Sequence, residues 1–192
     1  MQLGICASQE GFKQLEPLLN CAELEAILVP NHLLDEKRPQ LLASSKLSEL
    51  WPDIELLLGA MAAGALIRLI APLLQAKSID PAVLLLSGNG EQLIPLLGGH
   101  AAGGERYANR LAPLLQASVL TTGFSSSNGR VGLDIWGFAW GWQKGQGPWD
   151  ELMKKAARNE LLLVSQNSGE PLALESLKAS GVPIQAAESE GE

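Results

Sequence analysis

Cysteine, histidine and tyrosine are all scarce in this sequence: the chain of 192 residues has two cysteines, two histidines and one tyrosine. Cys6 and Cys21 lie near the start with no second pair, so neither a zinc-ligand pattern nor a disulfide framework is available. We therefore expect no metal held by the protein itself and a reduced, cytoplasmic setting.

Positive charge is also in short supply. Lys and Arg number 14 against 21 Asp and Glu, which gives a net charge of −7. No run of basic residues offsets this excess, and a surface of this kind repels nucleic acid and anionic lipid. The sequence thus predicts neither a nucleic-acid partner nor a membrane partner.

An uninterrupted membrane-spanning run is missing as well. The apolar stretch at 54–74 contains Glu55 and Arg68, with Gly59 and Pro72 as breakers. Because a buried Arg is costly in a bilayer, we interpret the stretch as a buried strand followed by a helix. The start of the chain has no basic segment leading into a long apolar core, so we expect no signal peptide.

What is present is an ordinary globular composition, 46% hydrophobic and 18% charged, in which short apolar runs alternate with helix-like stretches. This rhythm is typical of strands crossed over by helices in a largely parallel sheet. We expect an α/β fold with a mainly parallel, three-layer sheet domain and a second, smaller α/β domain. Strands are expected at 2–7, 26–29, 54–58, 82–86, 92–96 and 118–121, and helices at 10–19, 47–51, 62–74 and 105–115.

Asn89-Gly90 interrupts this alternation between two of the expected strands. Asn-Gly between apolar runs is a strong hairpin signal. The strands at 82–86 and 92–96 are therefore expected to form an antiparallel pair.

A cluster of Ser, Asn and Gly at 123–132 marks the expected boundary between a domain at 1–125 and one at 130–192. Beyond the boundary the pattern predicts helices at 149–159 and 173–180 and a strand at 161–166. Four tryptophans also fall in this part, within a short Gly-rich stretch. They suit either the core of a small domain or a platform for a flat macrocycle, and they are Trp136, Trp140, Trp142 and Trp149.

The strongest local signal is a glycine-rich loop between a strand and a helix, with the sequence LLGGHAAGGE over 96–105. Glycines let the backbone approach a ligand, and N–H groups at the start of a helix favour a carboxylate or phosphate. Neither the Walker spacing nor the dinucleotide spacing G-x-G-x-x-G is present. His100, inside the loop, suits a general base or a hydrogen-bonding group. A turn needed only for tight packing is the alternative.

Further polar residues flank the expected strands. Arg68 stands alone on an apolar helix, so we expect it to be half-buried and paired with a carboxylate, either Asp80 or a ligand. Lys77 and Asp80 precede a strand, where an ion pair that closes the turn is the simpler interpretation. Thr121 and Thr122 follow the last strand of the first domain and are expected at the carboxyl edge of the sheet, where ligands of open α/β sheets bind.

Four motifs occur together across residues 64–122: GALIRLIAPLL, KxxDPAV, LLGGHxxGG and VLTT. In this order and spacing they resemble the cobalt-precorrin-5A hydrolase family, also called cobalamin biosynthesis protein G. Residues after 133 resemble the middle domain of that family, and the first sixty residues agree with it in pattern.

The resemblance implies an enzyme of anaerobic cobalamin (vitamin B12) synthesis that opens the δ-lactone of cobalt-precorrin-5A and releases acetaldehyde, giving cobalt-precorrin-5B. This substrate is a carboxylate-rich tetrapyrrole that carries its own cobalt, so no further cofactor is implied. His100 and Glu105 are the implied catalytic residues. The residues implied to bind substrate, as backbone donors, hydroxyl donors or carboxylate partners, are Arg68, Lys77, Gly98, Gly99, Gly103, Gly104, Arg106, Thr121 and Thr122.

The sequence departs from the family pattern at two polar positions. An Asn after the histidine loop and an Asp after the paired threonines, both usual in the family, are replaced here. The family also continues into a third domain, so a C-terminal domain or a B12-pathway methyltransferase is an expected partner. Two other interpretations stay open: a non-catalytic module that binds a corrinoid or docks a pathway partner, and a nucleotide-binding α/β protein.

Overall fold

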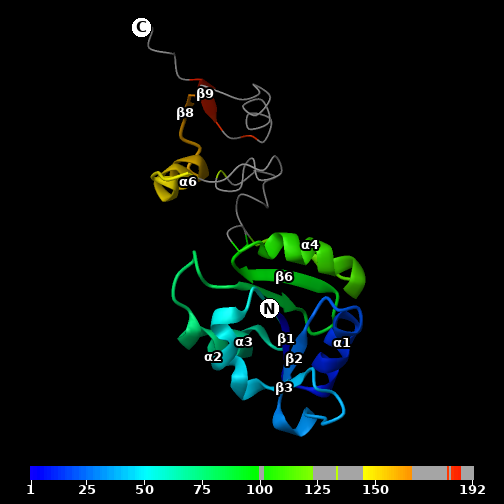
Figure 1. Ribbon diagram of the computed structural model, residues 1–192. Coiled ribbons are helices and arrows are strands. Elements are labelled where there is room, and N and C mark those ends of the chain that lie inside the picture. Colours follow the sequence, from blue (N-terminus) through cyan, green and yellow to red (C-terminus); the bar gives the residue numbers. More distant parts are fainter. Residues whose placement is uncertain (100–101, 123–132, 134–144, 166–180, 182, 187–192) are drawn as a thin grey trace. The chain divides into compact units, whose positions relative to one another are not determined.

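The computed structural model describes residues 1–99, 102–122, 133, 145–165, 181 and 183–186. The chain divides into two compact units, Met1–Thr122 and Gly123–Glu192, and each has its own sheet (Figure 1).

Seven strands build the first unit: β1 (Gln2–Cys6), β2 (Ala26–Val29), β3 (Leu41–Ala43), β4 (Leu56–Ala60), β5 (Ala82–Leu86), β6 (Gln92–Leu97) and β7 (Ser118–Val119). They form one sheet in the order β3-β2-β1-β4-β5-β6-β7. The first five in this order are parallel to one another, β6 is antiparallel to β5, and β7 is parallel to β6. The expected mainly parallel sheet is confirmed.

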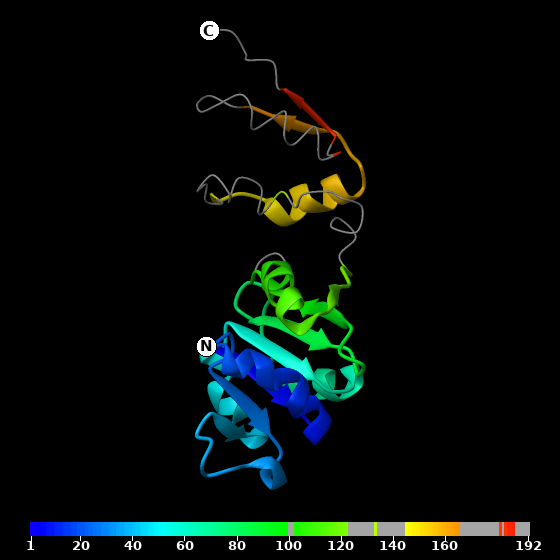
Figure 2. The ribbon, with the colours of Figure 1, turned by 90° about the vertical axis from the view of Figure 1, so that its right-hand side faces the viewer.

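Helices cover both faces of this sheet and complete the expected three layers (Figures 1 and 2). Leu15 of α1 and Leu111 of α4 are buried against one face. Leu66 and Ile70 of α3 are buried against the other, together with Trp51. The helices of this unit are α1 (Gln9–Asn20), α2 (Leu47–Leu50), α3 (Ala63–Ile70) and α4 (Gly104–Leu115), with 3-10 turns η1 (Asn31–Leu33), η2 (Ser44–Lys46), η3 (Trp51–Asp53) and η4 (Ala71–Leu73).

The central strands are buried on both faces because each face is covered by a helical layer. Leu56 and Leu58 of β4 point into the layer of α1 and α4, whereas Leu57 points into the layer of α3. Burying a leucine side chain contributes about 1.5–3 kcal/mol. This arrangement explains why the strands read as continuous apolar runs without polar alternation.

The turn between β5 and β6 sets the position of the candidate site. Ser87 donates its amide to the Gln92 carbonyl, and Gly90 has a φ of 76°, a conformation that glycine adopts easily. The predicted antiparallel pair is thereby confirmed. Because β6 runs against β5, the carboxyl end of β6 returns to the edge where the parallel strands begin, which we call the amino edge.

Two elements of the first unit differ from the sequence-based expectation. The strand β3 was not predicted, because it has only three residues and follows a polar, irregular segment. The helix expected over 62–74 ends at Ile70 and continues as η4. Pro72 accounts for the change, since it has no N–H to donate to the helix.

The second unit contains α6 (Trp149–Ala157) and two parallel strands, β8 (Leu162–Val164) and β9 (Ile184–Ala186). Leu162 is buried and packs against Leu152, Ala156 and Ile184. The expected smaller α/β unit is confirmed, although β9 was not predicted. The helix expected at 173–180 and three of the four tryptophans, Trp136, Trp140 and Trp142, lie outside the described residues.

Among the helices that the structure describes, none combines the length and the hydropathy needed to cross a bilayer.

Candidate functional site

Three of the sequence motifs meet at the amino edge. A Cβ placed on Gly98 would lie 3.2 Å from both Ala82 Cα and the Pro81 carbonyl oxygen, so the glycine loop touches the KxxDPAV segment. The hydroxyl oxygen of Thr122 lies 3.2 Å from the Pro95 carbonyl oxygen, which places the threonines along β6.

This location corrects the expected one for the threonines. Thr121 and Thr122 do follow the carboxyl ends of β6 and β7, but both strands run against β5. They therefore lie at the opposite edge from the crevice where ligands of open parallel sheets usually bind. The glycine loop and the threonines share that edge.

The glycine loop closes on itself through backbone hydrogen bonds. Gly104 donates its amide to the Gly98 carbonyl at 3.0 Å, and Glu105 donates its amide to the Gly99 carbonyl at 2.9 Å. Gly98 and Gly103 have φ values of 65° and 75°, which glycine tolerates and most residues do not. The Gly104 amide, which was expected to bind an anion, thus already donates its proton to a backbone carbonyl.

The Thr122 hydroxyl is committed in the same way, since it donates to the Pro95 carbonyl. Its expected role as a donor to an oxyanion conflicts with this bond. Thr121 is half-buried.

Of the two implied catalytic residues, His100 lies outside the described residues. Glu105 is half-buried in the first turn of α4, and its Oε1 lies 3.6 Å from the position that a Cβ on Gly99 would occupy. The Glu105 carboxylate therefore covers the loop segment that leads into His100.

A pocket of 390 Å³ opens at the amino edge next to this loop. Its lining combines apolar, polar and charged side chains from three segments that are far apart in the sequence. The lining residues are Ile54, Glu55, Ser78, Ile79, Asp80, Pro81, Ala102, Arg106 and Tyr107.

The basic residues expected to bind carboxylates are placed differently from one another. Arg106 lines the pocket, and Lys77 is exposed in the turn next to the lining residue Ser78. Arg68 is exposed on α3, in the layer on the other face of the sheet from α4, and donates to the Gly64 carbonyl of its own helix at 2.9 Å. The expectation that Arg68 is half-buried and paired with Asp80 is wrong.

Asp80 has a structural role in the turn before β5. Its two carboxylate oxygens lie 3.0 and 3.2 Å from the backbone nitrogen of Gln75. Within the described residues, Asp80 makes no ion pair with Lys77. The turn is closed by a backbone amide and not by the ion pair that the sequence suggested.

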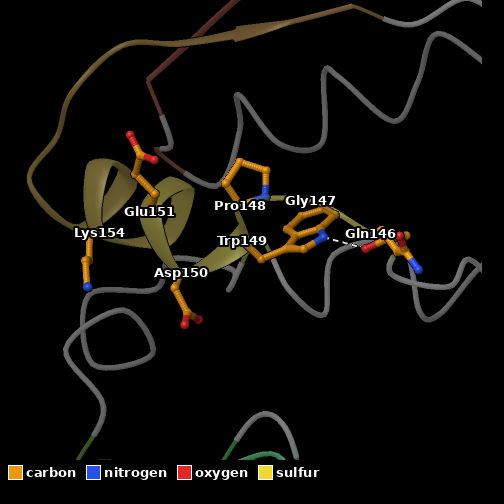
Figure 3. Close-up of a pocket in the computed structure, with 8 residues that line it drawn as sticks. Gln146, Gly147, Pro148, Trp149, Asp150, Glu151 and Lys154 are labelled. Atoms are coloured by element: carbon orange, nitrogen blue, oxygen red, sulfur yellow. Dashed lines mark hydrogen bonds between the residues drawn. The ribbon is translucent and has the colours of Figure 1, made fainter.

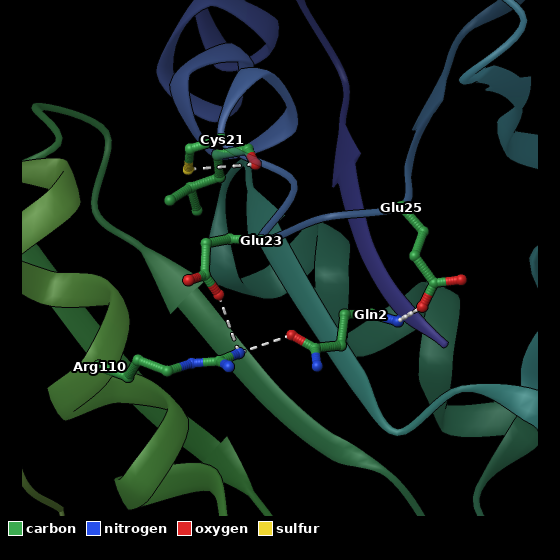
Figure 4. A network of polar contacts seen from close by, with 6 residues as sticks. Gln2, Cys21, Glu23, Glu25 and Arg110 are labelled. Carbon is green, nitrogen blue, oxygen red and sulfur yellow. Dashed lines mark hydrogen bonds and ion pairs between the residues drawn. The ribbon is translucent and has the colours of Figure 1, made fainter.

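A polar network holds α4 at the amino edge (Figure 4). The guanidinium of Arg110 lies 2.6 Å from the side-chain oxygen of Gln2 and 3.1 Å from a carboxylate oxygen of Glu23. Arg106 and Arg110 both lie over the ring of Tyr107, at 5.8 and 5.3 Å from its centroid. Sequence reasoning missed Tyr107 and Arg110, although Arg-Tyr-x-x-Arg at the start of a helix puts both cations beside one ring.

A second hollow, of 690 Å³, lies in the second unit, at the start of α6 (Figure 3). Trp149 lines it, and its indole nitrogen donates to the Gly145 carbonyl at 2.6 Å. The hollow has Asp150, Glu151 and Lys154 on its helical side.

Ligands for a metal ion are not grouped in the part of the chain that the structure describes: no three of its His, Cys, Asp and Glu side chains lie together in a suitable cluster. Of the three basic residues expected to bind carboxylates, the structure brings Arg106 and Lys77 to the amino edge near the pocket.

Comparison with known proteins relates the chain to cobalamin synthesis. Residues 45–125 match the family described as Cobalamin synthesis G N-terminal. A cobalt-precorrin-5A hydrolase from Priestia megaterium is 32% identical over 109 residues, which cover 56% of this chain and 29% of that protein. A second, from Salmonella typhimurium, is 36% identical over 77 residues, which cover 40% and 22%. The chain thus spans less than a third of the length of these curated relatives.

One solved structure, of a cobalamin biosynthesis protein G homolog from Sulfolobus solfataricus, aligns with 99% of this chain and 56% of that chain, at a TM-score of 0.49 and 16% identity. The matched residues 45–125 contain all four motifs noted in the sequence and every residue that surrounds the 390 Å³ pocket. Through this segment, the chain is similar to the cobalamin synthesis G N-terminal family and to curated cobalt-precorrin-5A hydrolases.

Proposed function

We propose that the chain acts in cobalamin assembly as the N-terminal part of a cobalt-precorrin-5A hydrolase. The observation that carries this proposal is the family match over residues 45–125, which contains the glycine loop, the threonines and the pocket of the amino edge. The names of the two curated relatives support a hydrolase that acts on a cobalt-precorrin tetrapyrrole.

The proposed reaction adds water to the carbonyl of the substrate's δ-lactone. The acyl C–O bond breaks, which gives a carboxylate and a hydroxyl on the carbon that carried the lactone oxygen. This hydroxyl then loses its proton and becomes the C=O of acetaldehyde, while the C–C bond that joins its carbon to the macrocycle breaks. The electron pair of that bond stays on the macrocycle, which takes up a proton to give cobalt-precorrin-5B. Such a step needs a base for the attacking water and donors for the developing oxyanion.

The residues of the amino edge suit these roles unequally. His100 is the proposed base, with the Glu105 carboxylate beside the loop to orient it. The Gly103 amide is the proposed donor to the oxyanion, because the Gly104 amide and the Thr122 hydroxyl already donate to backbone carbonyls. Lys77 remains a proposed partner for a substrate carboxylate at the edge of the site.

Acetaldehyde release tests the proposal. The chain is incubated with cobalt-precorrin-5A, and the acetaldehyde formed is measured with alcohol dehydrogenase and NADH. The proposal expects release by the parent and a loss of at least about 100-fold in His100→Ala, since general acid–base catalysis typically contributes this much. Equal rates in the two proteins would remove His100 from the mechanism.

A non-catalytic module that binds a corrinoid is the second candidate. The specific observation in its favour is that the chain spans only 29% and 22% of the two curated relatives. This candidate expects a spectral change of the corrinoid on binding but no acetaldehyde. Adding a separately produced C-terminal domain or a B12-pathway methyltransferase, the proposed partners, tests whether the reaction then appears.

A further inference from the structure

Of the described residues that line the 390 Å³ pocket, Arg106 is the one basic residue. It stands in the first turn of α4, where its guanidinium lies over the Tyr107 ring at 5.8 Å from the centroid. One guanidinium nitrogen also lies 3.2 Å from the position that a Cβ on Gly103 would occupy. The ring and the tight glycine turn therefore support the Arg106 side chain beside the opening.

Arg110 provides an internal comparison. It lies over the same ring at 5.3 Å, but it is also paired with Glu23 at 3.1 Å and hydrogen-bonded to Gln2 at 2.6 Å. Within the described ranges, Arg106 has no ion pair with a carboxylate. Of the two arginines over this ring, Arg106 is therefore the better placed to bind an anionic ligand.

Two carboxylates are also among the described residues that line the pocket, and they differ in whether a hydrogen bond compensates their charge. Both oxygens of Asp80 accept from the Gln75 amide, so part of its charge is already compensated. The side chain of Glu55 is exposed and faces the same opening. Glu55 therefore opposes any anion that Arg106 attracts, which limits the affinity of the site.

We propose that this pocket binds a carboxylate group, with Arg106 as the donor and Tyr107 as its support. In the proposed function, which this inference refines, the carboxylate is a side arm of the cobalt-precorrin. Ile79, 65% exposed at the same pocket, offers an apolar contact for the ring that carries the arm. Free small carboxylates share the chemistry, so the test must separate the two sources.

Equilibrium dialysis of the full chain against cobyrinic acid, a corrinoid with carboxylate arms, measures the site directly. Arg106→Gln is expected to weaken binding by at least about tenfold, because it removes a hydrogen bond between charged groups. Glu55→Gln is expected to strengthen binding a few-fold, because it removes the opposing charge. Arg110→Gln, the matched control on the same ring, is expected to leave binding within about twofold.

Two further ligands identify the source. Cobinamide, whose arms are amides, is expected to bind the parent weakly and to be insensitive to Arg106→Gln. Succinate is expected not to compete at concentrations where cobyrinic acid saturates the site. Effective competition by succinate would overturn the assignment to a tetrapyrrole arm. Equal binding of cobyrinic acid by the parent and Arg106→Gln, or no binding by either, would overturn the site itself.

The acetaldehyde assay separates this inference from the proposed function. If the parent releases acetaldehyde and Arg106→Gln has an unchanged KM, the carboxylate site is wrong and the hydrolase proposal stands. If no variant releases acetaldehyde but binding of cobyrinic acid follows Arg106 and Glu55 as expected, the site stands and the hydrolase proposal fails. Circular dichroism of each variant shows whether the fold is retained.

Discussion

At the scale of single residues, the two cysteines have opposite surroundings. Cys6 is buried in β1, and its burial raises the pKa of the thiol to about 11, against a smaller opposite effect of a backbone hydrogen bond at Ser8. Cys21 is exposed after α1. The thiolate is the reactive form of cysteine, so the two residues should differ strongly in reactivity.

Labelling of the native chain with a thiol reagent at pH 8 is expected to modify Cys21 and to spare Cys6. Mass spectrometry of the labelled peptides distinguishes the two sites. Unfolding in guanidinium should make both react. Rapid labelling of Cys6 in the native chain would contradict its described burial.

The glycine loop makes the sharpest residue-level prediction on stability. Gly98 has a φ of 65°, and a Cβ placed on it would lie 2.7 Å from the Ala102 Cβ. Gly98→Ala is therefore expected to lower the free energy of unfolding by about 1–3 kcal/mol, measured by urea denaturation.

Gly88→Ala is the matched control, because a Cβ there would have nothing within 4 Å. It is expected to change stability by less than about 1 kcal/mol, with any gain coming from reduced freedom of the unfolded chain. Equal losses in the two variants would show that the loop tolerates a side chain at Gly98.

At the scale of elements, the sequence was a good guide to the buried strands and a poor one to short edges. β2 and β5 were predicted at their observed bounds, because continuous apolar runs between turn signals leave little choice. β3 was missed because a strand of three residues is too short to show a recognisable hydrophobic pattern. The Asn-Gly turn correctly predicted that β6 is antiparallel to β5. That this direction of β6 brings the glycine loop to the amino edge was not predicted.

The sequence identified some residues of the candidate site but missed others, such as Tyr107, and it did not predict the hydrogen bonds. The glycine loop, the Lys77 turn and the threonines were all identified from residue types. That Gly104 and Thr122 donate to backbone carbonyls depends on how the loop and β6 close in space. Sequence spacing does not contain this information, since it requires knowing which carbonyl lies within reach.

The first helix offers a test at the same scale. The Ser8 hydroxyl accepts from the Gly11 amide at 3.2 Å and caps α1. Ser8→Ala is expected to lower the free energy of unfolding by about 1 kcal/mol, whereas Ser45→Ala, at an exposed position of η2, should have little effect. Equal stability of the two variants would argue against the cap.

The Ser8→Ala substitution is also expected to change the pKa of Glu10. The pKa of Glu10 is lowered by a hydrogen bond from its own amide and, next, by one from the Ser8 hydroxyl. A lowered folded-state pKa stabilises the protein above the unfolded pKa, and this contribution is lost as the pH falls through the folded value. In Ser8→Ala the pKa of Glu10, followed by NMR, is expected to rise toward its ordinary value.

At the scale of the whole molecule, the family match and the candidate site both belong to the first unit. Residues 45–125 cover β4 to β7 and the helices between them, which is the half of the sheet that carries the amino-edge pocket. The usual crevice of such a sheet would instead lie at the carboxyl ends of β1 and β4, where the strand order reverses. The ligand is therefore proposed to bind at the amino edge of the sheet, where ligands of such sheets bind less often.

Hydrogen exchange with and without cobyrinic acid, read by mass spectrometry, decides between the two edges. The account predicts slower exchange on binding in peptides that cover residues 77–81, 98–107 and 120–122, and no change in peptides that cover 7–11 and 61–64. Protection confined to 7–11 and 61–64 would place the ligand at the carboxyl edge and contradict the central claim.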